Sequence, residues 1–136
     1  MRYLLDTNVL SDVRRGASES LETWFSEQAV ADLAISSITL LELDVGVRRL
    51  GLRDPTAGGL LRVWLDEIVR PMFVERTLAV DELVALEASR LQAVDPMPDM
   101  DALIAATALS HGLTLVTRNT ANMDRSGVAL LNPWLL

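Results

Sequence analysis

Two hydrophobic patterns alternate along the chain. Short, mostly apolar runs are typical of buried parallel strands, and they occur at 3–5, 33–36, 73–74, 78–80, 113–117 and 128–131. Between most of these runs, apolar residues recur every three or four positions, which predicts helices with one buried face. The helices expected from this spacing cover about 8–14, 18–29, 38–50, 55–68, 81–93 and 102–109.

Strands that alternate with helices through short links predict an α/β fold. We expect a central, mostly parallel, twisted sheet of four to five short strands flanked by helices on both faces. Gly51 is expected to stop one helix and Pro71 to interrupt another, and 53–59 is the most loop-like segment. A chain of 136 residues is expected to form a single domain spanning residues 1–136.

Composition narrows the possible functions. Half of the residues are hydrophobic, but no run approaches the eighteen or so apolar residues of a membrane span and no leader pattern opens the chain, so we expect a soluble, cytoplasmic protein with no membrane partner. The absence of cysteine excludes disulfides, a thiol nucleophile and zinc–thiolate sites. All twelve basic residues are arginine, which excludes every mechanism that needs a lysine.

A net charge of −7 argues against a protein that coats nucleic acid by charge alone. It does not exclude a nuclease, because divalent cations held by clustered carboxylates reverse the sign of the local field.

The first apolar run stops at an acidic residue, Asp6, followed by Thr7 and Asn8. The crevice beyond the carboxyl ends of parallel strands is where α/β proteins bind ligands, so Asp6 is a candidate site residue. The ordinary alternative is that Asp6 only caps the next helix. Another strand is expected to end at Thr117, which would place Thr117 and Asn119 at the same rim.

Three further carboxylates lie in helical patterns. Glu42 interrupts an apolar helical sequence, where it either faces a site or forms the polar edge of the helix. Asp99 is expected to be the N-cap of the helix that follows, and Asp101 in its first turn can point toward a cavity. Alternatively, both carboxylates only complement the helix dipole.

Asp6, Glu42 and Asp101 can converge at one edge of the sheet. Clustered carboxylates repel one another, and Mg2+ or Mn2+ would offset that repulsion. Such ions activate water and neutralise a phosphorane-like transition state, so the cluster favours phosphodiester hydrolysis.

Five motifs carry a resemblance to a known family. They are Leu-Leu-Asp-Thr-Asn-Val-Leu at 4–10, Ser-Ser-Ile-Thr-Leu-Leu-Glu-Leu at 36–43, Asp-Ala-Leu-Ile-Ala-Ala-Thr-Ala at 101–108, Thr-Arg-Asn at 117–119 and Leu-Asn-Pro-Trp at 131–134. Their order and spacing resemble PIN-domain ribonucleases, specifically VapC-type toxins of type II toxin–antitoxin pairs, over essentially the whole chain.

The resemblance implies a site and its chemistry. Asp6, Glu42 and Asp101 would form the acidic catalytic site of an Mg2+- or Mn2+-dependent endoribonuclease, with Asp6 and Asp101 as direct ligands. Glu42 would bind a second metal or orient the attacking water. Asn119 stands where many family members have a fourth acidic residue, and Asp99 could supply the missing charge. The supporting residues implied by position are Thr7, Asn8 and Thr117.

The resemblance also implies partners: an RNA substrate, a second copy in a homodimer, and a small VapB-like antitoxin in a groove that leads to the site. The residues that could form this groove, or else belong to the core, are Trp24, Phe25, Leu40, Leu43 and Val47. Two alternative functions stay open, a housekeeping PIN nuclease and a catalytically silent PIN module that binds protein or RNA. A haloacid-dehalogenase-like phosphatase is disfavoured because Asn8 replaces its second aspartate and lysine is absent.

Overall fold

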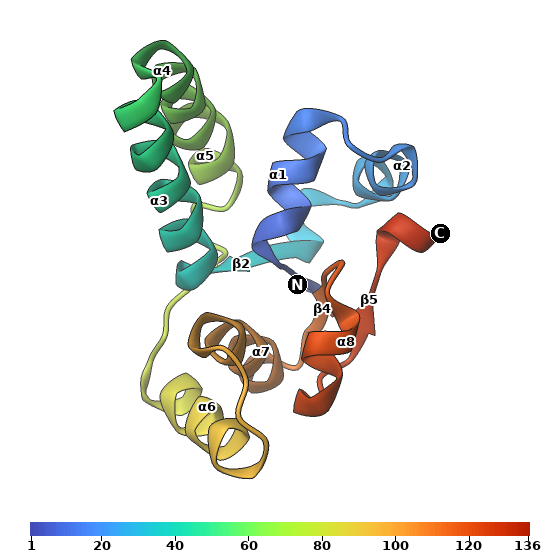
Figure 1. The fold of residues 1–136 in the computed structure, drawn as a ribbon. Helices are drawn as coiled ribbons and strands as arrows, with labels where there is room; N and C mark the ends of the chain where they lie inside the picture. Colours follow the sequence, from blue (N-terminus) through green and yellow to red (C-terminus); the bar gives the residue numbers. More distant parts are fainter.

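The computed structural model describes residues 1–136 and is built around a five-stranded parallel sheet (Figure 1). The strand order is β3-β2-β1-β4-β5, and every neighbouring pair is parallel. The strands are β1 (Tyr3–Leu5), β2 (Leu33–Ser36), β3 (Thr77–Leu78), β4 (Thr114–Val116) and β5 (Leu130–Leu131). The α/β fold expected from the sequence is therefore confirmed.

The strand order places a topological switch point beside the first strand. From β1 the chain builds β2 and β3 on one side, then crosses to the other side to form β4 and β5. Ligands of open α/β sheets bind outside the carboxyl ends of the strands at such a point. The crevice after β1 and β4 is therefore the expected location of a site.

Helices connect and cover the strands (Figure 1). The α-helices are α1 (Thr7–Arg15), α2 (Glu19–Glu27), α3 (Ser37–Arg53), α4 (Pro55–Trp64), α5 (Arg70–Met72), α6 (Glu82–Val94), α7 (Asp99–His111) and α8 (Thr120–Met123). The remaining turns are a π-helical segment, η2 (Leu65–Val69), and three 3-10 turns, η1 (Val30–Asp32), η3 (Asp124–Ser126) and η4 (Pro133–Leu135).

Two hydrophobic cores sandwich the sheet, because successive strand residues point to opposite faces. In β1, Leu4 packs with residues of α6 and α7, whereas Leu5 packs with residues of α1, α2 and α3. The same alternation occurs in β4, where Leu115 belongs to the first core and Val116 to the second. Both faces are thus covered, which explains why the strands read as continuous apolar runs.

The helical hairpin of α3 and α4 corrects two predictions. Gly51 does not stop α3, which continues to Arg53, and 53–59 is not a loop, because only Asp54 separates the two helices. Asp54 caps α4 by accepting a hydrogen bond from the Ala57 N–H at 3.1 Å. Gly58 lets the helices approach closely, since a Cβ there would lie 2.4 Å from the Gly51 Cα.

The prediction that Pro71 interrupts the helix is wrong, because the helical segment continues through it. The preceding turn widens into the π-helical segment η2, in which the Arg70 N–H donates to the Leu65 carbonyl, and Pro71 then lies in the first turn of α5, where no N–H partner is needed. The expected strand at 73–74 is also wrong, since Phe73 is buried in the turn that follows α5.

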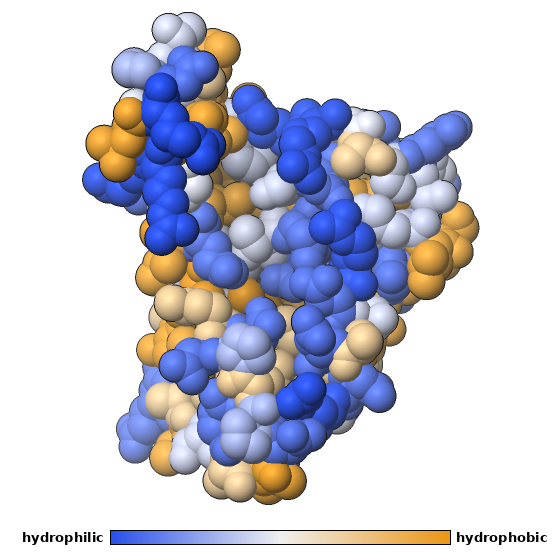
Figure 2. Space-filling model, in the orientation of Figure 1, coloured by the Kyte–Doolittle hydropathy of each residue, from blue (hydrophilic) through white to orange (hydrophobic).

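No helix is both long enough and apolar enough to cross a bilayer. In Figure 2, hydrophilic side chains occupy much of the middle of the face shown, and hydrophobic groups appear at its upper left, over the arm formed by α3 and α4. Leu52, Leu60 and Val63 are exposed on these two helices.

Candidate active site

A polar pocket of about 280 Å³ opens at the carboxyl ends of β1 and β4. It receives residues from α1, α3, α7 and the turn after β4, and no hydrophobic side chain lines it. Its lining residues are Asp6, Thr7, Asn8, Ser11, Asp12, Arg15, Glu42, Asp101, Arg118 and Asn119. The three carboxylates predicted to form the site, Asp6, Glu42 and Asp101, are brought together here.

Asp6 follows β1 directly and is the N-cap of α1. One carboxylate oxygen accepts a hydrogen bond from the Thr7 N–H at 2.8 Å, and the other accepts one from the Thr117 hydroxyl at 2.7 Å. The Thr117 hydroxyl in turn accepts a hydrogen bond from the Asn119 N–H at 3.0 Å. Asp6 is thus both a helix cap and a buried, fixed carboxylate at the pocket, so the two interpretations of the sequence are compatible.

Glu42 projects from α3 and is held by α1. The Thr7 hydroxyl donates a hydrogen bond to its carboxylate at 2.7 Å, and the exposure of Glu42 is intermediate. Thr7 therefore links two of the acidic residues, since its N–H contacts Asp6 and its hydroxyl contacts Glu42.

Asp99 and Asp101 both lie in the first turn of α7, but only Asp101 lines the pocket. The prediction that Asp99 is the N-cap is wrong, because that position is taken by Pro98. The exposed Asp99 carboxylate instead accepts a hydrogen bond from the Gln92 side chain at 3.0 Å. Asp99 therefore lies outside the set of residues that line the pocket.

Asp6, Glu42 and Asp101 have no cationic partner, since none of the eight ion pairs of the structure includes them. Burial raises the pKa of the Asp6 carboxyl, and its hydrogen bonds with Thr117 and Thr7 only partly offset this. Burial also raises the pKa of the Asp101 carboxyl, as do the negative charges of Asp6 and Glu42. The charged forms of Asp6 and Asp101 are therefore less favourable here than in water, and a bound cation would offset this.

The residues of the pocket fit a hard divalent cation. The atoms that could bind a metal ion are carboxylate and amide oxygens, which Mg2+ and Mn2+ prefer as ligands. One of them, the buried Oδ1 of Asn8, has no hydrogen-bond partner. No group of three or more acidic or histidine side chains is close enough together in this structure to hold a metal ion. An open site of one or two carboxylates completed by water is the usual arrangement for Mg2+.

The pocket also contains a charged group that the sequence did not indicate. Asp12 is buried with 1% of its surface exposed, and it accepts hydrogen bonds from Arg15, from Arg118 at 3.0 Å and from the Trp134 indole N–H at 3.1 Å. In the sequence, Asp12 looks like any polar residue of a surface helix. The only available signal was Arg118, in the polar turn already expected beside Asp6.

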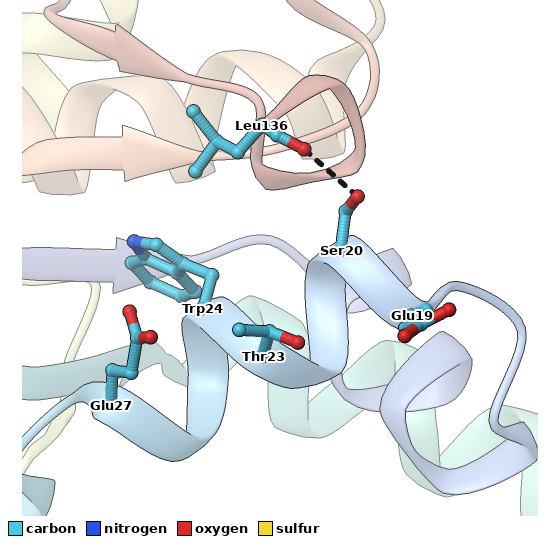
Figure 3. A pocket seen from close by; sticks show the side chains of 6 residues that line it. All are labelled: Glu19, Ser20, Thr23, Trp24, Glu27 and Leu136. Carbon is cyan, nitrogen blue, oxygen red and sulfur yellow. Dashed lines mark hydrogen bonds between the residues drawn. The ribbon is translucent and has the colours of Figure 1, made fainter.

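The residues expected to form a partner groove are divided between core and surface. Trp24, Leu43 and Val47 are buried in the core beneath α3, and Phe25 is partly buried against it. Leu40 lines two open cavities, of about 480 Å³ and 360 Å³, on the α3 and α5 side of the molecule, and Trp24 lines another, of about 300 Å³, between α2 and Leu136 (Figure 3). The alternative that these residues belong to the core is therefore correct for most of them.

Comparison with known proteins adds the family. The PIN domain model matches residues 3–127. The chain is 36% identical to "Plasmid stability protein StbB" of Pseudomonas syringae pv. tomato, over 96% of this chain and 97% of the other. It is 34% identical to "Toxin FitB" of Neisseria gonorrhoeae, with the same coverages. It is 32% identical to "VapC ribonuclease Y4jK" of Sinorhizobium fredii, over 96% of both chains.

Solved structures agree with the sequence comparisons. The crystal structure of FitAcB from Neisseria gonorrhoeae matches with a TM-score of 0.92 and 34% identity, over 98% of this chain and 99% of the other. A chain of a toxin–antitoxin complex from Klebsiella pneumoniae matches with a TM-score of 0.72 and 26% identity, over 97% and 98% of the two chains.

Proposed function

The chain belongs to the PIN-domain family, and from this premise we propose that it is a divalent-metal-dependent endoribonuclease that acts as the toxin of a toxin–antitoxin pair. We further propose that residues 1–136 act as one PIN domain. The observation that carries the proposal is the set of three carboxylates, Asp6, Glu42 and Asp101, which share a wholly polar pocket without any cationic partner. Relatives with such names as "VapC ribonuclease Y4jK" and "Toxin FitB" support the activity and the role.

Asp6 and Asp101 are the proposed direct ligands of Mg2+ or Mn2+, with Glu42 beside them. When bound, such an ion activates water and offsets the charge that develops on a phosphodiester during hydrolysis. The Thr117 hydroxyl and the Thr7 N–H hold Asp6 in a single orientation, and the Thr7 hydroxyl does the same for Glu42. A pocket without apolar side chains suits a charged phosphate better than a hydrophobic ligand.

Asn119 keeps the position of a fourth acidic residue but adds no charge. The Asn119 backbone N–H donates to the Thr117 hydroxyl, and Asn119 lines the pocket. Its side-chain amide oxygen is therefore available as a neutral metal ligand near the carboxylates. Because the site has three unpaired carboxylates rather than four, we propose that it binds one metal ion firmly and a second one weakly.

The proposed protein partner is a small VapB-like antitoxin, with a homodimer of this chain in the resulting complex. The similarity to a chain of a toxin–antitoxin complex supports this partner. Expression of the protein alone should arrest bacterial growth, and co-expression of its antitoxin should restore growth. Growth without arrest, by cells that contain active enzyme, would favour a housekeeping nuclease instead.

The activity is tested by incubating the purified, antitoxin-free protein with a mixed RNA pool in Mg2+, in Mn2+ or in chelator. We expect metal-dependent cleavage that falls about a thousandfold in Asp6→Asn, since loss of metal stabilisation removes several kcal/mol from the transition state. The matched control is Asp99→Asn, which removes an acidic residue outside the pocket and should retain activity. Absence of cleavage by folded, metal-loaded protein would favour the catalytically silent PIN module.

A further inference from the structure

A second charged group lines the acidic pocket and has no part in the metal site proposed above. Asp12 is its buried centre, and Arg15 and Arg118 each form an ion pair with it. These two arginines are the only cationic residues that line the pocket. One arginine would be enough to neutralise Asp12, so the group keeps a net positive charge beside the unpaired carboxylates.

Trp134 fixes Arg118 in two ways. Its ring lies under the Arg118 guanidinium, 5.5 Å from centroid to Cζ, and its indole N–H donates to the same Asp12 oxygen that Arg118 contacts. Stacking and a shared acceptor together restrict a side chain that otherwise has many rotamers.

The turn that carries Trp134 is itself anchored. The Trp134 N–H donates to the Asn132 side chain at 3.0 Å, and the Ser20 hydroxyl of α2 donates to the Leu136 main-chain oxygen at 2.9 Å (Figure 3). Figure 3 shows η4 lying over α2 at this contact. The indole is therefore held by a fixed segment.

Arg118 keeps most of its binding capacity. Its side chain is 53% exposed, and its hydrogen bond with Asp12 uses one of the five N–H donors of a guanidinium. A pre-oriented guanidinium binds phosphate well because little rotamer entropy remains to be lost.

We propose that Arg118 binds a phosphate of the RNA strand next to the one hydrolysed, and that Asp12 and Trp134 are positioning residues that hold it there. This rests on the proposed ribonuclease function for the identity of the ligand. The acidic residues and their metal would act on one phosphate, while Arg118 fixes the neighbouring backbone. Arg15, the other arginine on Asp12, would add charge with less order, because no aromatic ring stacks on it.

The test measures binding of a fluorescein-labelled, mixed-sequence, single-stranded RNA of about 12 nucleotides in Ca2+, at several salt concentrations, together with cleavage in Mg2+. We expect Arg118→Ala to weaken binding about tenfold and to lower the slope of log Kd against log salt by about 0.7, the value for one phosphate contact on a single strand. Arg118→Lys should restore the slope but not the full affinity. Trp134→Phe, which removes the indole donor and leaves a smaller ring under Arg118, should weaken binding about threefold.

The chain offers matched controls. Arg14 lies over the Trp64 ring at 5.7 Å, and neither residue lines the pocket, so Arg14→Ala and Trp64→Phe remove the same chemical groups elsewhere. Both should leave RNA affinity and its salt slope unchanged. The affinity for Mn2+ should not fall in Arg118→Ala, since the variant removes a positive charge from the pocket, and this separates phosphate binding from damage to the metal site.

The outcomes distinguish this inference from the proposed function. Unchanged affinity and salt slope in Arg118→Ala would overturn the phosphate role, even if the protein cleaves RNA. A loss in Arg118→Ala with none in Trp134→Phe would overturn the positioning role of Trp134. Binding that depends on Arg118 without any cleavage would uphold the inference while contradicting the ribonuclease proposal.

Discussion

Asp6 and Asp12 lie on the same short helix and line the same pocket, yet their surroundings are opposite. Both carboxylates are buried. Asp12 contacts two arginines and an indole N–H, whereas Asp6 contacts a hydroxyl and a backbone N–H and has no cation. The negative charge of Asp12 is neutralised by partners within the folded chain. The Asp6 group contains no positive charge, so the proposed metal ion would supply it.

The difference separates a carboxylate that is paired within the chain from carboxylates that are not, and the two classes should respond differently to mutation. A buried charge with its own partners costs a great deal to disturb, because removing one partner leaves the others uncompensated. A buried charge without partners destabilises the chain in the absence of a ligand, and it persists because the ligand needs it. Asp12 belongs to the first class, and Asp6 belongs to the second together with Asp101, which is half-buried and also has no cationic partner.

The largest effect on stability should come from Asp12. We expect Asp12→Ala to lower the free energy of unfolding by about 3 kcal/mol, since it frees two arginines and the Trp134 N–H from a buried acceptor. Asp101→Asn should cost nothing or increase stability in chelator, because it removes a charge that the pocket disfavours. Urea unfolding of the three proteins measures this difference. Equal losses in both variants would refute the division into two classes.

A bound metal ion should stabilise the folded protein through the second class of carboxylates, Asp6 and Asp101, and not through Asp12. At a free concentration of about 100 times Kd, Mn2+ or Mg2+ should add about 2.7 kcal/mol to the free energy of unfolding. The measurement is the melting temperature with and without the ion, and the increase should disappear in Asp6→Asn. Arg15→Ala is the control. Arg15 pairs with Asp12 rather than with Asp6, so this variant should keep the increase in melting temperature caused by the ion. A full response in Asp6→Asn would show that the ion binds elsewhere.

The convergence of Asp6, Glu42 and Asp101 on one pocket could be predicted because two of these residues follow strong local patterns. Asp6 ends a buried strand and Asp101 opens a helix, so the sheet topology alone brings them to one edge. Asp12 could not be found in this way. Its partners Arg118 and Trp134 are 106 and 122 residues away, and nothing local in the sequence marks a helical aspartate as buried.

The errors in the predicted fold have the same origin, because tertiary contacts overrode local signals. Glycines suggested that α3 ends at 51, but Gly51 and Gly58 are the close contact between α3 and α4. Pro71 suggested a break, which the π-helical turn before it removes. Aspartate is a preferred N-cap residue, which suggested Asp99, yet Pro98 occupies that position. The Gln92 side chain donates a hydrogen bond to the Asp99 carboxylate instead.

A smaller effect should appear in the pH dependence of the metal-free protein. Asp101 has a pKa in the folded state above its unfolded value of about 3.9, because of burial first and then the charges of Asp6 and Glu42. The folded state then binds more protons, so this contribution to stability is complete below pH 3.9 and is lost as the pH rises through the folded pKa. The difference in melting temperature, Asp101→Asn minus the unchanged protein, should therefore increase as the pH is raised from about 4 to about 7. A constant difference over this range would contradict the raised pKa.

The smallest effect should come from Asp99, which shares the first turn of α7 with Asp101 but contacts Gln92 rather than the pocket. Asp99→Asn removes a charge that favours the helix dipole, so the melting temperature should fall by about 1–3 °C. The increase caused by Mn2+ should nevertheless be unchanged, whereas Asp101→Asn should lose most of it. The two residues are of the same type and lie in the same helix turn, but Asp101 lines the pocket whereas Asp99 is exposed and contacts Gln92. A lost Mn2+ response in Asp99→Asn would mean that Asp99 replaces the missing acidic residue at position 119 in solution, and that α7 turns its first residue toward the site when the ion binds.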